Sequence, residues 1–130
     1  MKYDKTIKII LILGSIYYFI GAIVHFFGLS IYPWYDGRLF SSYHDTVISL
    51  SAMVLGLILF ALSKNIEKYR QLINLVIISG IIAIIFSLYI IFFVNLIGTI
   101  KQEQTIVEMV LLIIYVGFLT YLNYKNKKIL

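Results

Sequence analysis

Residues 25–45 have the sequence HFFGLSIYPWYDGRLFSSYHD and separate two long apolar runs. This stretch holds both histidines, the only tryptophan, the only proline and one of the two arginines of the chain. The residues on either side of it are almost all apolar. A polar segment between two such runs is typical of a connector between membrane spans. The rest of the chain is therefore expected to form the scaffold that holds this stretch.

The composition places the chain in the membrane. Of its 130 residues, 62% are hydrophobic and 13% are charged, which is more apolar surface than a soluble domain of this length can bury. We predict a single all-α domain, residues 1–130, that is integral to a membrane. The formal charge of +5 would suit nucleic acid in a soluble protein. Here the basic residues lie in short segments between apolar runs, so no nucleic-acid partner is expected.

Four apolar runs predict four membrane-spanning helices, at about residues 9–29, 43–62, 72–97 and 106–122. The third run is long enough that its helix must tilt or protrude from a hydrocarbon core of about 30 Å. In the first connector, Pro33 and Asp36-Gly37 are typical of turns. Short connectors predict an up-down four-helix bundle.

The basic residues predict the orientation. Three Lys or Arg lie in each of residues 1–8, 63–71 and 123–130, whereas the other two connectors hold only Arg38 and Lys101. Basic residues accumulate on the cytoplasmic side of membrane proteins, so both termini are expected in the cytoplasm. We expect a multi-pass protein of the plasma membrane, or inner membrane, of a cell.

Small and polar residues at helical spacing predict which faces look into the bundle. On the first helix, Gly14, Gly21 and Gly28 recur every seven residues, with Tyr18 and His25 on nearly the same stripe. The corresponding stripes of the second and third helices are Asp45, Ser49, Ala52, Gly56 and Ser63, and Asn74, Ile81, Leu88 and Asn95. These stripes are also what simple packing seams between helices look like.

Several polar side chains are expected at one level, near the outer ends of the four helices. These are His25, His44, Asp45, Asn95 and Glu108. Asp36 and Arg38 lie in the connector above them, and Trp34 and Tyr43 are expected at the interface as walls of the site. We therefore predict a polar pocket that opens to the outside, with the connector folded over it. Ionisable groups at membrane depth are costly and for that reason are candidates for function.

Each of these residues also has a structural explanation. Ser42-Tyr43-His44-Asp45 has the spacing of a capping box at a helix start, and Asp36 with Gly37 is typical of a turn. Arg38 can contact a lipid phosphate or pair with Asp36. His44 can lie among lipid headgroups, and Glu108 can reach the interface or pair with His25. The role of His25 can also be purely structural, as one partner of an interhelical hydrogen bond.

The favoured function is that of an accessory or ligand-binding membrane protein. Beside the lipid bilayer, its partner would be a small ligand, a lipid headgroup or another membrane subunit. The alternative is a membrane enzyme that acts on a lipid or isoprenoid by His/carboxylate acid–base chemistry, with His25 and Glu108 as the pair. No cofactor is predicted. Haem or a divalent metal is kept as an alternative, although the chain has no close pair of metal ligands such as HExxH and no Cys-x-x-Cys-His motif.

Overall fold

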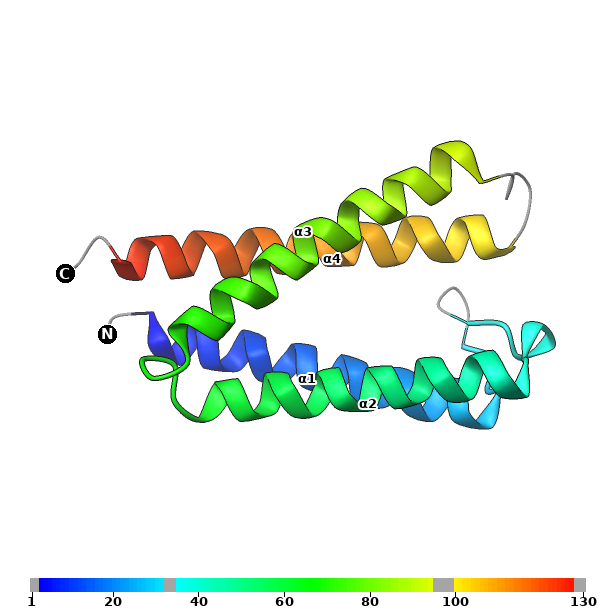
Figure 1. The fold of residues 1–130 in the computed structure, drawn as a ribbon, viewed down its shortest axis with the longest axis horizontal. Coiled ribbons are helices and arrows are strands. Elements are labelled where there is room, and N and C mark those ends of the chain that lie inside the picture. The colour runs from blue at the N-terminus through cyan, green and yellow to red at the C-terminus, as the bar shows by residue number, and fades with distance from the viewer. Residues whose placement is uncertain (1–2, 32–34, 95–99, 128–130) are drawn as a thin grey trace.

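The chain forms four long helices in a computed structural model that describes residues 3–31, 35–94 and 100–127 (Figure 1). The helices are α1 (Asp4–Phe27), α2 (Ser42–Lys64), α3 (Arg70–Phe93) and α4 (Ile100–Lys127), with a short 3-10 helix, η1 (Gly37–Leu39), between α1 and α2. Within the described ranges no strand forms, and an isolated bridge joins Ile31 and Tyr35. The predicted all-α class is confirmed.

All four helices are long and apolar enough to cross a membrane. The apolar segments are Asp4–Phe27, Ser42–Lys64, Arg70–Phe93 and Gln102–Asn126, with 23 to 25 residues each. At about 1.5 Å per residue each exceeds a hydrocarbon core of about 30 Å. Large apolar side chains also point away from the protein, among them Leu50, Phe86 and Phe92, which are 65%, 64% and 74% exposed. Such a surface suits lipid rather than water.

The first helix ends where glycine permits a left-handed backbone. Gly28 has φ +62°, and the N–H groups of Gly28 and Leu29 donate to the carbonyls of His25 (3.3 Å) and Val24 (3.0 Å). This is the Schellman arrangement, which closes a helix and satisfies its last carbonyls. The helix therefore stops at Phe27, before the end of the apolar run at residue 29, and it begins earlier than residue 9.

The helices pack as two pairs that meet at one end (Figure 1). α1 packs along α2, α3 packs against α4, and α1 also contacts α4. We call the end where α1 begins and α4 finishes the terminal end. It also holds the connector 65–69. We call the opposite end, where residues 28–31 and 35–41 lie, the loop end.

The apolar core lies toward the terminal end. Its buried members are Ile7, Leu11, Leu59, Leu62, Ile66, Ile73, Ile77, Val116, Leu119 and Leu122. At the loop end, by contrast, no described residue of α3 after Ile77 is buried, and none of α4 from residue 102 to 115. The loop end is therefore held mainly by contacts between α1 and α2.

The predicted stripe on the second helix is confirmed as an interior face. Asp45, Ser49, Ala52, Gly56 and Ser63 are all buried. Ser49 and Gly56 form hydrogen bonds with α1. Ser49 Oγ donates to the Ala22 carbonyl (2.7 Å), and the Gly56 carbonyl accepts from Ser15 Oγ (2.8 Å). Hydroxyl groups that bond to a facing backbone are a common means of joining membrane helices.

The stripes predicted on the first and third helices are wrong as continuous seams. On α1, Gly14 packs under the ring of Tyr115, whereas nothing lies within 4 Å of where a Gly21 side chain would begin, and Gly28 serves as the cap. A seven-residue repeat drifts around a straight helix, so its members need not share one neighbour.

On α3 the buried residues are Ile73 and Ile77. Ile81 and Leu88 are exposed, and Asn74 instead accepts a hydrogen bond from Asn123 of α4 (2.6 Å). Asn95 lies outside the described residues.

Candidate functional site

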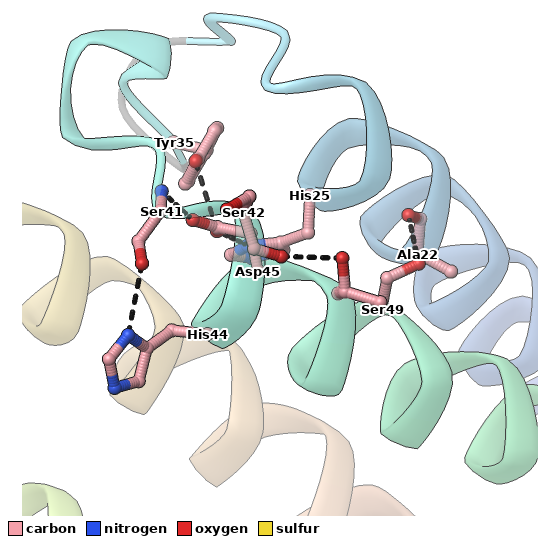
Figure 2. Close-up of polar contacts among 9 residues, drawn as sticks. Ala22, His25, Tyr35, Ser41, Ser42, His44, Asp45 and Ser49 are labelled. Carbon is pink, nitrogen blue, oxygen red and sulfur yellow. Dashed lines mark hydrogen bonds and ion pairs between the residues drawn. The ribbon is translucent and has the colours of Figure 1, made fainter.

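Asp45, in the first turn of α2, is the centre of a polar cluster at the loop end (Figure 2). Its residue is 4% exposed, and its carboxylate has three partners. Oδ1 lies 2.7 Å from Nδ1 of His25 and accepts from the Tyr35 hydroxyl at 3.0 Å, and Oδ2 accepts from the backbone N–H of Ser41 at 2.6 Å. We call Asp45, His25, Tyr35 and Ser41 the Asp45 cluster. An ionised carboxylate only accepts, so the geometry assigns the hydrogen to Nδ1 of His25.

Local backbone geometry at the start of α2 places Asp45. Ser41 is the residue that precedes the helix, with an extended backbone, and the helix begins at Ser42. The carboxylate of Asp45 takes the Ser41 N–H, as the acid of a capping box does, and the Ser41 hydroxyl bonds to Nδ1 of His44 (3.0 Å). The predicted capping box that starts at Ser42 is therefore wrong: the helix is capped at Ser41, four residues before Asp45, and the Ser41 side chain makes no capping hydrogen bond.

His25 reaches the cluster from the last turn of α1. Its side chain is 21% exposed, and its ring lies 4.5 Å from the ring of Tyr35, centroid to centroid. Of the polar contacts between α1 and α2, the one between His25 and Asp45 lies nearest the loop end. It is one helical turn from the hydrogen bond between Ser49 and Ala22. His25 thus joins two helices and the connector that follows α1.

Tyr35 brings the connector into the cluster. The backbones of Ile31 and Tyr35 exchange two hydrogen bonds, at 2.8 and 2.9 Å, which close a small loop. Burial, followed by the hydrogen bond to the charged Asp45, raises the pKa of the Tyr35 hydroxyl to about 12. Tyr35 therefore stays a neutral donor to Asp45 throughout the physiological pH range.

The connector is folded back onto the end of α1. The N–H of Gly37 donates to the Ser30 hydroxyl (2.8 Å), and a side chain at Gly37 would collide with the carbonyl oxygen of Gly28. Only glycine permits this close approach of two backbone segments. The described part of the connector is thus an ordered cover over the end of α1.

Asp36 and Arg38 form an ion pair with each other. Arg38 Nη2 and Nε lie 2.7 and 3.0 Å from Asp36 Oδ2, and the Arg38 N–H also donates to Oδ1 (3.0 Å). Hydrogen bonds from Arg38 lower the pKa of the Asp36 carboxyl. Asp36 precedes η1, so the predicted turn and its ion pair are both confirmed.

Glu108 has no such partner among the residues that the structure describes. Its side chain is exposed on α4, and it interacts with His25, Tyr17 and Tyr18 only through electrostatics. The predicted contact between His25 and Glu108 is therefore wrong, and Asp45 takes its place. The reason is packing: α1 lies along α2, whereas the buried contacts of α4 are nearer the terminal end.

The remaining predicted residues do not join the cluster. Tyr43 is 73% exposed, and its ring lies edge-on to the exposed ring of His44. Trp34 and Asn95 lie outside the described residues. In the part of the chain that the structure describes, no group of three or more His, Cys, Asp or Glu side chains forms a set that could hold a metal ion.

Two residues of the site were missed at the level of sequence. Neither Tyr35 nor Gln104 was among the residues predicted for the pocket. With its amide oxygen turned toward the connector, Gln104 accepts from the N–H groups of Asp36 (3.0 Å) and Tyr35 (3.3 Å) and so links α4 to it. Neither residue belongs to a periodic pattern, so no sequence signal marked them.

No family model, no curated protein and no solved structure matches this chain.

Proposed function

We propose that the chain is a small multi-pass protein of the cell membrane, an up-down four-helix bundle with both termini in the cytoplasm. Support for this orientation comes from the charges. Apart from Arg38 and Lys101, the described Lys and Arg residues lie near the terminal end. This is where α1 begins, α2 joins α3 and α4 finishes. Positive charge of this kind is retained on the cytoplasmic side.

Reporter fusions test the orientation. A reporter after Leu130 and one within residues 64–71 are expected to be active only as cytoplasmic reporters, and one inserted at Asp36-Gly37 only as an extracytoplasmic reporter. A C-terminal fusion that reports the outside would overturn the orientation.

We further propose that the loop end binds a ligand, such as a small amphiphile or lipid headgroup, or a group presented by a partner membrane subunit. The observation that carries this proposal is Glu108. It is an acid within an apolar helix segment, and it has neither a hydrogen bond nor an ion pair with any described residue. An ionised group costs about 2.5–3.5 kcal/mol at the bilayer centre, and less toward the edge. A bound donor or cation would offset that cost.

The neighbours of Glu108 indicate the chemistry of such a ligand. Tyr115 follows two helical turns deeper on the same face of α4, and its hydroxyl is buried without a partner in the described chain. Tyr17 and Tyr18 of α1 lie within electrostatic range of Glu108. A ligand with a cationic or hydrogen-bond-donating head and an apolar body matches the Glu108 carboxylate and the tyrosine rings near it.

A second function has one observation in its favour. The 2.7 Å contact with Asp45 fixes the His25 ring through Nδ1, which leaves Nε2 as the nitrogen for proton transfer. A carboxylate that orients an imidazole is the arrangement of many acid–base sites. The alternative is therefore an enzyme acting on a lipid or isoprenoid, with the His25–Asp45 pair and Glu108 in place of a direct His25–Glu108 pair.

Native mass spectrometry of the protein purified in mild detergent tests the binding function. The wild-type chain is expected to retain a defined bound mass that Glu108→Gln loses, because the amide cannot pair with a cation. The matched control is Glu108→Asp, which keeps the carboxylate and should keep the bound mass. Equal spectra for all three proteins would refute a ligand site at Glu108. If Asp45→Asn cells accumulate a lipid that wild-type cells convert, the enzyme is supported instead.

A further inference from the structure

A hollow of about 290 Å³ lies at the terminal end, away from the Asp45 cluster. It is bounded by the first turns of α1, the last turn of α2 and the connector that follows α2. Three lysines line it: Lys5 and Lys8 from α1, and Lys64 from α2. This volume is enough for a phosphate and its attached groups.

The charges around the hollow are not balanced. Lys5, Lys8 and Lys64 are exposed and make no ion pair in the described chain. Two acids, Asp4 and Glu67, also line the hollow.

The first of these acids is already engaged elsewhere. Its Oδ1 accepts from Asn126 Nδ2 at 2.6 Å and lies 4.0 Å from Arg70 Nη2. Among the described lining residues, three lysines are therefore set against a single acid, Glu67, that has no other ion pair.

The hollow lies at the ends of two apolar helices, where charged residues give way to apolar surface. Lys64 is the last residue of α2, and its Nζ lies 4.1 Å from the centroid of the Phe60 ring one turn earlier. On α1, exposed apolar side chains begin at Ile9, directly after Lys8, and continue with Leu13 one turn on. A lysine whose stem follows apolar surface while its ammonium reaches the polar boundary is typical of the membrane interface.

We propose that this hollow binds the phosphate of an anionic phospholipid. The ammonium groups of Lys5, Lys8 and Lys64 surround the phosphate, and the acyl chains lie along the apolar side chains that begin at Ile9. Basic hollows between membrane helices at headgroup level are suited to such lipids. This site is separate from Glu108. An experiment that contradicts the ligand site at Glu108 therefore does not contradict the phospholipid site.

Thermal melting of the full chain in mild detergent, with added lipid, tests the site. Dioleoyl phosphatidylglycerol is expected to raise the Tm more than dioleoyl phosphatidylcholine at equal concentration. Each lysine removed should weaken the apparent affinity for phosphatidylglycerol about five-fold, and the triple variant K5Q/K8Q/K64Q on the order of 100-fold. Lys68→Gln is the matched control, since Lys68 lies in the same connector but does not line the hollow.

Further arms identify the source of the phosphate and guard against misfolding. If glycerol 3-phosphate or inorganic phosphate raises the Tm as much as the lipid does, the site takes a soluble phosphate. The triple arginine variant K5R/K8R/K64R keeps the charge and should keep the lipid effect. If the triple glutamine variant does not fold, the three single variants are measured. A lipid effect that survives loss of the lysines, or that Lys68→Gln removes equally, would overturn the site.

Discussion

Replacing Asp45 with alanine is expected to lower the free energy of unfolding by about 3–5 kcal/mol. The substitution removes the only acceptor that joins the His25 imidazole, the Tyr35 hydroxyl and the Ser41 N–H. All three donors would then lie at the loop end without their acceptor, away from the main apolar core. Unfolding in mixed micelles titrated with dodecyl sulfate, followed by helical circular dichroism, measures the change.

His44→Ala provides the comparison for Asp45→Ala. His44 is the preceding residue of the same helical turn, but it is exposed and bonds only to the Ser41 hydroxyl. Its removal should change the free energy of unfolding by no more than about 0.5 kcal/mol. Similar losses for the two variants would show that the Asp45 cluster does not hold the loop end together.

The helices and one interior face could be predicted from the sequence because both follow from local rules. Long apolar runs define spans whatever their neighbours are, and the stripe from Asp45 to Ser63 marks a face that every close packing must bury. The ends of the helices were harder to predict. Gly28 terminates α1 inside an apolar run through its positive φ, which hydropathy does not report.

The partners within the site could not be predicted, because periodicity assigns a residue to a face and not to a neighbour. His25 faces inward in either arrangement, but its partner depends on whether α2 or α4 packs against the last turn of α1. Tyr35 contributes through a small loop closed by backbone bonds to Ile31. Such a closure depends on the tertiary fold and leaves no periodic pattern in the sequence.

Two double-mutant cycles are expected to separate the partners of His25. In the first, His25→Ala and Asp45→Ala should each be costly, but the double variant should cost about 1–3 kcal/mol less than the sum. The first substitution already removes the 2.7 Å contact that the second would lose. Dodecyl sulfate unfolding of the four proteins gives the coupling energy.

In the second cycle, His25→Ala and Glu108→Gln should be additive to within about 0.5 kcal/mol, because the two side chains interact without a hydrogen bond. Glu108→Gln alone should cost little stability, since its carboxylate has no described partner to lose. Strong coupling in this cycle and none in the first would place Glu108, and not Asp45, beside the imidazole. Coupling in the first cycle alone would show that Glu108 has no structural role in this contact. Its carboxylate would then be available to bind a ligand.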